Sequence, residues 1–273
     1  MRIQHNLNAM NSLRQLGTNN TNTGKNLEKL SSGFRINRAG DDAAGLAISE
    51  KMRAQINGLE MATKNAEDGI SLIQTAEGGL NETHAILQRM RELAVQAANG
   101  TNQAEDLQSI QDEIDALAEE IDRIGDSTKF NGIDLLNGGS MASDGIGFQI
   151  GANNADYESV SLTIASMKAD ALGVDNIDVT SDALSALDDI DDAIADVSAA
   201  RAGLGAMQNR LEHTINNLGV TTENLTAAES RIRDVDMAKE MMAYTKNNIL
   251  TQAAQAMLAQ ANMQPQGVLQ LLQ

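Results

Sequence analysis

The feature of this sequence that most limits its fold is the length over which apolar residues recur every three or four positions. One such stripe runs through residues 43–98, and a second runs without a miss through residues 107–124. This spacing puts apolar side chains on one helix face, and sustained repeats are typical of coiled coils. The second stripe consists of Leu107, Ile110, Ile114, Leu117, Ile121 and Ile124.

Local signals set the ends of the first long helix. Asp41 and Asp42 supply an N-cap and a favourable charge for the helix dipole, and Asn99-Gly100 ends the helix. At 1.5 Å per residue, the helix is expected to be roughly 80 Å long. Three glycines inside it are expected to weaken it locally: Gly69, Gly78 and Gly79.

A third apolar stripe runs from Leu187 to Ile232, and each end of the chain adds an amphipathic segment. The short link before residue 104 makes the second helix antiparallel to the first. Since the long helices run out and back, the first and last segments are expected to lie together. Residues 17–24 have poor helix propensity, so a helix there needs a partner surface, and Pro265 is expected to interrupt the last segment.

Only the middle of the chain reads as β structure. Apolar and polar residues alternate over 146–150 and 160–164, and 151–154 is a candidate turn between them. Aromatic residues make up only 2 %, so aliphatic side chains must build the core. The predicted fold is mainly α, a long antiparallel α-helical coiled-coil bundle with a small β-hairpin region at about 130–180.

Charge is distributed unevenly along the chain. Residues 101–200 carry a net charge of -19, whereas residues 1–40 carry +5 and residues 241–273 carry +1. Ends that combine apolar stripes with little repulsive charge can associate with copies of themselves. Three segments follow: an N-terminal segment (1–40), a rod with long helices (41–235) and a C-terminal segment (236–273).

The composition excludes several classes of function. The net charge of -18 has the wrong sign for binding nucleic acid, and no apolar run is long enough to span a membrane. The first 20 residues lack the apolar core of a cleavable signal peptide. No cysteine is present, no histidine lies in an HExxH pattern, and no GxSxG or phosphate-binding loop occurs. The acidic run at 188–192 reads as a solvated helix face, so we expect no enzyme, metal or cofactor.

Several motifs, in order, resemble the bacterial flagellin family. At the N-terminal end they are Leu30-Ser31-Ser32-Gly33-Phe34-Arg35-Ile36-Asn37 and Asn65-Ala66-Glu67-Asp68-Gly69-Ile70-Ser71. At the C-terminal end they are Leu204-Gly205-Ala206-Met207-Gln208-Asn209-Arg210-Leu211 and Met257-Leu258-Ala259-Gln260-Ala261-Asn262. The resemblance covers about residues 1–138 and 186–273, and is greatest to short, Bacillus-type flagellins without large outer variable domains.

The resemblance implies a structural subunit that self-polymerises into the extracellular flagellar filament, a passive propeller for motility. The terminal segments would form the inner tube of this filament. We hypothesise that they are largely disordered in the monomer and fold on assembly. Their apolar side chains would then be buried between subunits: Ile3, Leu7, Met10, Leu13, Ile249, Met257, Leu258, Leu269 and Leu272.

The resemblance also implies partners. These are the flagellar type III export apparatus, a secretion chaperone, the filament cap, hook-junction proteins and a host Toll-like receptor. Receptor contact would involve Arg89, Leu93 and Glu113. Three alternatives stay open: a hook-filament junction protein, a secreted helical interaction protein, and a flagellin with a metalloprotease insert, against which the missing HExxH argues.

Overall fold

The computed structural model describes residues 6–139 and 145–271, with side chains as far as residue 264. The chain divides into two compact units. Unit 1 comprises Met1–Ala54 and Asn224–Gln273, and unit 2 comprises Gln55–Glu223. Helices α2 (Ala43–Ala97) and α5 (Ala183–Arg233) contribute residues to both units.

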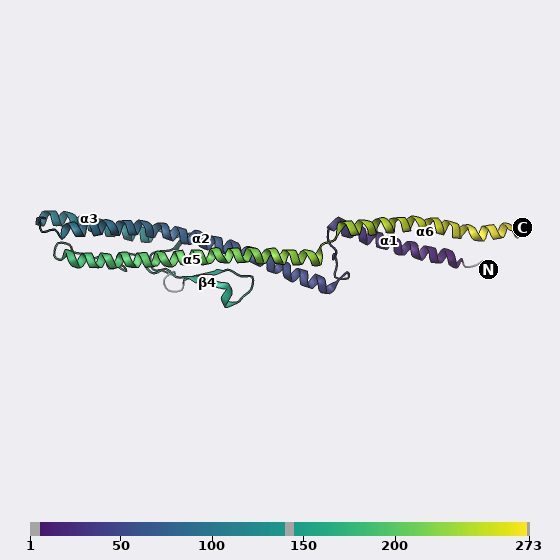
Figure 1. The fold of residues 1–273 in the computed structure, drawn as a ribbon, viewed down its shortest axis with the longest axis horizontal. Coiled ribbons are helices and arrows are strands. Elements are labelled where there is room, and N and C mark those ends of the chain that lie inside the picture. Colours follow the sequence, from purple (N-terminus) through teal and green to yellow (C-terminus); the bar gives the residue numbers. More distant parts are fainter. Residues whose placement is uncertain (1–5, 140–144, 272–273) are drawn as a thin grey trace. The chain divides into compact units, whose positions relative to one another are not determined.

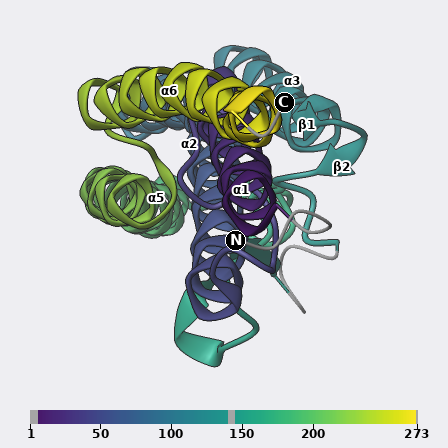
Figure 2. The same cartoon turned by 90° about the vertical axis from the view of Figure 1, so that its right-hand side faces the viewer.

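Unit 1 is built on two helices from opposite ends of the chain. Helix α1 (Leu7–Ser32) and helix α6 (Met237–Leu271) lie side by side (Figures 1 and 2), which confirms the expected pairing of the terminal segments. The side chain of Asn6 caps α1 by accepting a hydrogen bond from the Ala9 amide at 3.1 Å. Its Nδ2 also donates to the carbonyl of Ala261 on α6 at 2.7 Å.

Two segments are more helical than their sequences indicate. Helix α1 continues through residues 17–24, where the hydroxyls of Thr18, Thr21 and Thr23 donate to carbonyls four residues earlier. The neighbouring α6 supplies the partner surface that this segment needs. The expected interruption at Pro265 is wrong, since α6 continues to Leu271. A proline removes one backbone donor, and the turns on either side keep theirs.

Within unit 1, a short stretch of backbone pairing joins the loop after α1 to the end of α5. Phe34 and Asp234 form an isolated antiparallel bridge, flanked by a hydrogen bond from the Arg35 amide to the Arg233 carbonyl at 2.7 Å. The Arg233 guanidinium stacks 4.8 Å from the centre of the Phe34 ring and pairs with Glu50 at 2.7 Å. The cation–π contact therefore holds the end of α5 against the loop after α1, and the ion pair holds it against the beginning of α2.

The two aspartates before α2 have different roles. Asp42 caps the helix, because its Oδ1 accepts a hydrogen bond from the Gly45 amide at 2.9 Å. Asp41 instead closes the preceding loop by accepting from the amides of Asn37 and Arg38. These two backbone hydrogen bonds, chiefly the one from Arg38, lower the pKa of Asp41. The predicted N-cap is thus confirmed for one aspartate of the pair.

Unit 2 is a helical core formed by α2, α3 (Ala104–Ser127) and α5 (Figure 1). The predicted seam of α3 is confirmed, because Ile110, Ile114 and Ile121 are buried. Helix α2 buries more than its predicted stripe. It contributes a second set of core residues, which includes Leu72 and Leu93, because one helix lies in contact with two others.

The β structure is confirmed as two small antiparallel pairs. Strands β1 (Lys129–Phe130) and β2 (Ile133–Asp134) are joined by Asn131-Gly132, with φ of 49° and 80°. These positive angles suit the tight turn that an Asn-Gly pair favours. Strands β3 (Ile146–Gln149) and β4 (Ser159–Leu162) pair from Ile146↔Leu162 to Gln149↔Ser159, with a short 3₁₀ turn, η1 (Asp156–Glu158), between them.

A segment of loops and turns, residues 163–182, follows β4 and packs several apolar side chains into the core of unit 2. Two polar residues of α3 hold its backbone. Gln111 donates to the Ile177 carbonyl at 2.6 Å and accepts from the Val179 amide at 2.9 Å. Asp122 accepts from the Ala169 amide at 2.9 Å. Hydrogen bonds from helix side chains thus hold the backbone of this segment in place.

Asp178 gives this segment a defined pH response. Its carboxylate accepts hydrogen bonds from Ser181 and Thr180, which lowers its pKa to about 2 from an ordinary value of 3.8. A lowered pKa stabilises the fold above pH 3.8, and this contribution disappears as the pH falls through about 2. Asp178→Asn is therefore expected to lower the urea midpoint of the chain at pH 7, with the difference vanishing near pH 2. Asp189→Asn, on the exposed face of α5, controls for the change in net charge. A difference that persists unchanged at pH 2 would contradict this role.

The glycines inside α2 mark where the β region lies against it. A Cβ at Gly79 would lie 2.8 Å from Cδ1 of Leu136 and 2.8 Å from Oγ1 of Thr128. A Cβ at Gly58 would lie 2.8 Å from that of Ala152, whereas a Cβ at Gly78 would meet nothing within 4 Å. Gly58 and Gly79 therefore allow close approach, and Gly78 does not serve this purpose.

Adjacent glycines make a matched test of this packing. Gly78→Ala is expected to raise the free energy of unfolding by about 0.5–1 kcal/mol, because alanine favours the helix. Gly79→Ala is expected to lower it by about 1–3 kcal/mol, because Leu136 and Thr128 must move. Urea denaturation followed by circular dichroism measures both. Equal effects of the same sign would show that the β region does not pack on Gly79.

Candidate assembly surface

The contact between α1 and α6 is made largely by small and polar residues. The positions of α1 that are shielded from solvent repeat every three or four residues, and α6 is the helix that packs on α1 in unit 1. We call these positions and their partners on α6 the polar seam. On α1 they are Ala9, Ser12, Leu16, Asn19, Thr23 and Asn26. On α6 they are Tyr244, Asn247, Thr251, Ala254, Leu258 and Ala261.

Paired asparagines lie within this polar seam. In the amide orientation that satisfies its neighbours, Asn26 accepts a hydrogen bond from Nδ2 of Asn247 at 3.1 Å and donates to Glu240 at 3.1 Å. A polar pair at a seam position fixes the register of two helices, because any shift leaves both amides unpaired. The seam therefore aligns α1 with α6 without burying much apolar surface.

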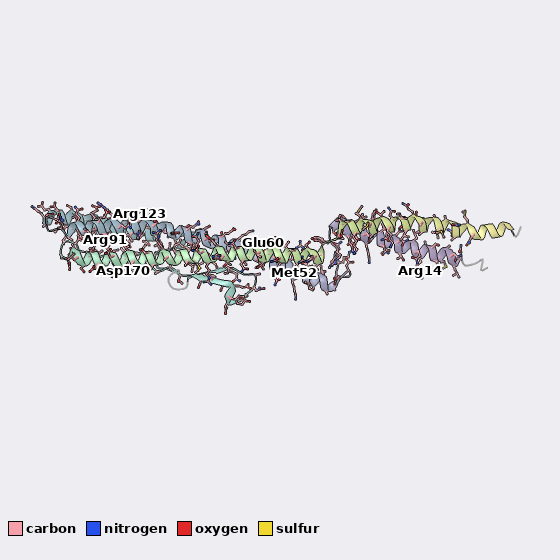
Figure 3. All side chains as sticks on the ribbon, in the orientation of Figure 1. Arg14, Met52, Glu60, Arg91, Arg123 and Asp170 are labelled. Carbon is pink, nitrogen blue, oxygen red and sulfur yellow. The ribbon has the colours of Figure 1, made fainter. Side chains whose placement is uncertain are left out.

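Most of the large apolar side chains of both helices are exposed outside the polar seam, and the seam itself includes Leu16 and Leu258. Helix α1 buries none of its residues. Figure 3 shows its side chains, Arg14 among them, projecting from the helix. We call the exposed apolar set the outer apolar face. It consists of Leu7, Met10, Leu13 and Leu27 on α1, and Met237, Met241, Met242, Ile249, Leu250, Met257 and Met263 on α6.

This arrangement reverses the usual pattern of a soluble helix pair. Amphipathic helices normally bury their apolar stripe against a neighbour and expose polar residues. Here small and polar residues make up most of the polar seam, and most of the large apolar side chains lie outside it. The surface is also nearly free of repulsive charge, since residues 241–273 carry one lysine and no acid. Exposed apolar side chains in this number are typical of a site of protein–protein contact.

Most of the described assembly residues predicted from the sequence lie on the outer apolar face. They are Leu7, Met10, Leu13, Ile249 and Met257. Leu258 is half-buried in the polar seam. Ile3 and Leu272 lie outside the described residues, as does the side chain of Leu269.

The three predicted receptor residues lie close together on α2 and α3. The guanidinium of Arg89 binds one carboxylate oxygen of Glu113 through Nε at 3.0 Å and Nη2 at 2.9 Å. The hydrogen bond to Glu113, and then that to Glu92, raises the pKa of Arg89. Both Arg89 and Glu113 are about half exposed, so they are accessible to a partner. Leu93 is only 2 % exposed and packs in the core.

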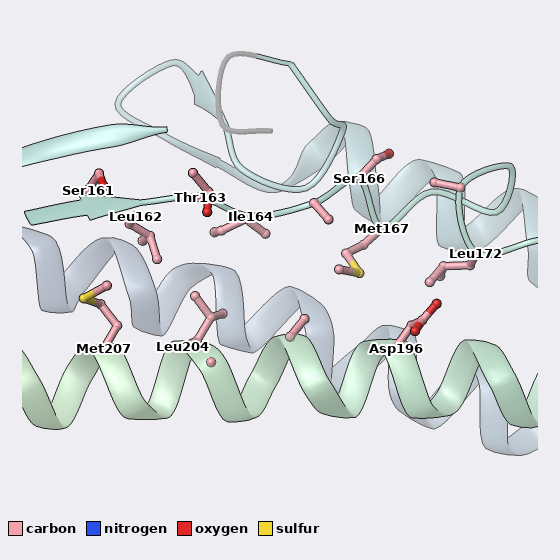
Figure 4. A pocket seen from close by; sticks show the side chains of 14 residues that line it. Ser161, Leu162, Thr163, Ile164, Ser166, Met167, Leu172, Asp196, Leu204 and Met207 are labelled. Carbon is pink, nitrogen blue, oxygen red and sulfur yellow. The ribbon is translucent and has the colours of Figure 1, made fainter. Parts of the chain in front are cut away.

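A cavity of about 490 Å³ lies between the first part of the segment after β4 and helix α5 (Figure 4). Its wall is mostly apolar, with Leu162, Leu204 and Met207 on one side and Asp196 as its charged residue. Among the described residues, no three or more carboxylate or histidine side chains gather to hold a metal ion. No helix in the described part of the chain has the length and hydropathy needed to cross a bilayer.

Fold and surface together define a structural class of protein: a helical subunit whose two ends pair and present an apolar face. Comparisons with known proteins identify the family within this class. Residues 3–141 match the bacterial flagellin N-terminal helical region, and residues 187–272 match the bacterial flagellin C-terminal helical region. The chain is 60 % identical to a flagellin of Bacillus subtilis (strain 168) and 59 % identical to a flagellin of Halalkalibacterium halodurans, each over the full length of both chains.

The chain belongs to the bacterial flagellin family, as one of its short, Bacillus-type members. It is a structural subunit of the extracellular flagellar filament, and not an enzyme. A solved structure, a putative flagellar hook-associated protein from Vibrio parahaemolyticus, shares the fold. The two structures match with a TM-score of 0.59 and 14 % sequence identity. The match covers 71 % of this chain and 100 % of the Vibrio parahaemolyticus chain.

Proposed function

We propose that the subunit polymerises by burying the outer apolar face of α1 and α6 between neighbouring copies. One observation carries this proposal: the polar seam uses the polar side of each helix inside the subunit and leaves the apolar side unused. Burial of apolar surface contributes about 25 cal/mol per Å². Subunits related by rotation and rise, without closure, form an open helical polymer.

Assembly would also order the terminal segments. Fixing the backbone costs about 1–2 kcal/mol per residue, and the polar seam buries few apolar groups to offset it. The pairing of α1 and α6 is then stable only when neighbouring subunits cover the outer apolar face. The termini are thus disordered in the free monomer and become helical on polymerisation.

Seeded growth tests this function directly. Purified monomer is added to short filament fragments, and negative-stain electron microscopy measures filament length over time. We expect long uniform filaments with seeds, and none from a chain trimmed of residues 1–40 and 236–273. Monomers that persist in the presence of seeds would favour the remaining alternatives, a hook-filament junction protein or a secreted helical interaction protein.

The apolar terminal segments also support proposed roles in export and in capping of the filament. A chain whose termini remain unfolded can pass through the flagellar type III export apparatus, with a secretion chaperone on its C-terminal segment. The filament cap would then fold each arriving subunit at the tip, and hook-junction proteins would supply the first layer. The exposed apolar residues of α6 support this proposal, because a free segment of this kind needs a shielding partner.

Contact with a host Toll-like receptor is a second proposed function. The exposed pair of Arg89 and Glu113 supports it, while Leu93 would act only by shaping the helix from within the core. Arg89→Ala is expected to lower receptor activation roughly tenfold or more if the guanidinium is a buried charged contact in the complex. Filament growth should be unchanged.

The matched control for Arg89→Ala is Arg123→Ala on α3, where the arginine pairs with Glu120 on its own helix. A reporter-cell assay with monomeric protein measures activation by each variant. Receptor activation that is equal for Arg89→Ala and the unmodified chain would remove Arg89 from the contact surface.

A further inference from the structure

Methionine is concentrated on the outer apolar face. The chain has 13 methionines and no cysteine. Six of the methionines are exposed on α1 and α6: Met10, Met237, Met241, Met242, Met257 and Met263. Their exposed fractions range from 49 % to 68 %, whereas Met90 and Met167 in the core of unit 2 are 0 % and 5 % exposed.

The outer apolar face is therefore rich in accessible thioether sulfur, with no thiol in the chain to react first. A thioether exposed to peroxide is oxidised to a sulfoxide, which is polar and chiral. The sulfur lone pair attacks one peroxide oxygen, an S–O bond forms and the O–O bond breaks. The departing oxygen leaves with both hydrogens as water. Sulfur loses two electrons, and the peroxide gains them.

We propose that these six methionines form an oxidation-sensitive site, at which a peroxide blocks addition of the subunit to the filament. The proposal rests on the proposed assembly through the outer apolar face. A sulfoxide placed in an apolar contact buries a strong acceptor without a partner, which costs free energy at every interface that contains it. Loss of affinity should be roughly tenfold or more for each sulfoxide buried.

Assembly should in turn protect the same sulfur atoms. In a filament, neighbouring subunits cover the outer apolar face and exclude the oxidant. Free subunits would then be the vulnerable form, and polymerised subunits the resistant one. Two methionines of unit 2 serve as internal standards for the oxidation rate, since Met61 is exposed and Met90 is buried.

The experiment treats free monomer and intact filaments with hydrogen peroxide, and then measures oxidation at each methionine by peptide mass spectrometry. In the monomer we expect the six sites to react at a rate similar to Met61 and well before Met90. In filaments we expect the six sites to react several-fold more slowly than in the monomer. Equal rates in both forms would overturn the proposal.

Seeded growth gives the functional readout. Oxidised monomer is expected to elongate seeds only at a critical concentration raised roughly tenfold or more. Methionine sulfoxide reductases A and B, supplied with a dithiol, should restore growth. Oxidised monomer that elongates seeds normally would overturn the proposal while leaving assembly through this face intact. Untreated monomer that fails to elongate seeds would overturn both.

Three variants separate the sulfur chemistry from general damage. A chain in which all six are replaced (Met10→Leu, Met237→Leu, Met241→Leu, Met242→Leu, Met257→Leu and Met263→Leu) keeps its apolar volume and is expected to grow after peroxide treatment. Growth of this variant that is inhibited as strongly as that of the native chain would overturn the proposal. Met257→Gln introduces polarity without an oxidant and should raise the critical concentration, and Met257→Leu should not. Equal growth of these two single variants would also overturn it.

Discussion

Leu13→Asp is expected to abolish filament growth at concentrations where the native chain grows fully. Leu13 is 58 % exposed in the subunit and lies at the centre of the outer apolar face of α1. Burial of a leucine side chain contributes about 1.5–3 kcal/mol, and an unpaired carboxylate in its place adds a larger desolvation cost. Every subunit that is added to a helical polymer makes this contact, so the cost enters each step of filament growth. Seeded growth measured by light scattering gives the critical concentration.

The matched control is Gln15→Asp, which adds the same charge to the same helix at an exposed polar position. We expect this variant to grow filaments at nearly the native critical concentration. Unfolding of unit 2 should be unchanged in both variants, because neither residue belongs to its core. Filament growth by Leu13→Asp equal to that of Gln15→Asp would refute assembly through this face.

Leu87→Ala is expected to lower the free energy of unfolding of the chain by about 2–5 kcal/mol. Leu87 is fully buried in the helical core of unit 2, where truncation removes apolar burial and leaves a cavity. Native stabilities are typically about 5–15 kcal/mol, so this single change removes a large fraction. Urea denaturation of the monomer followed by circular dichroism measures the loss.

Val95→Ala on the same helix is the control, since Val95 is exposed and alanine favours helix. Its effect is expected to stay within about 0.5 kcal/mol. A loss for Leu87→Ala no greater than that for Val95→Ala would show that the helices do not share one core. The two tests also separate the roles of the units, because Leu13→Asp affects growth and Leu87→Ala affects stability.

The long helices and the small strands were predictable from local pattern. The repeat that includes Ile110, Ile114 and Ile121 identified α3, because a three-and-four spacing has one structural solution over this length. The pairing of β3 with β4 followed from the alternation over 146–150 and 160–164, and the turn between β1 and β2 has the Asn-Gly sequence that such turns favour. In each case the signal lies within a few residues of the element that it specifies.

Features that depend on distant partners were not predicted. The segment of loops and turns after β4 depends for its fold on Gln111 and Asp122 of α3. Leu93 lies outside the predicted stripe of α2, and its burial requires a second helix on that side. By contrast, a helix over residues 17–24 was expected to need a partner surface, and contact with α6 supplies that surface despite weak local propensity.

The candidate surface was predicted in part. The apolar residues of the terminal segments were identified as contacts between subunits, but the residues that pair α1 with α6 were not identified. The missing signal was the frame of small and polar residues that includes Ser12, Asn19 and Asn26, which repeats at the same spacing as the apolar stripe. Read as a second seam, this frame predicts which side of α1 faces α6. Leu258 belongs to that seam. Without the seam in view, it was assigned to subunit contacts and not to the helix pair.

A reconstruction of the assembled filament by cryo-electron microscopy, at side-chain resolution, tests the central claim most directly. The account predicts that Leu7, Met10, Leu13 and Met257 each contact a neighbouring subunit, and that Asn26 and Asn247 remain paired within one subunit. A filament in which these apolar side chains face solvent or an open channel, with contacts made elsewhere, would contradict it.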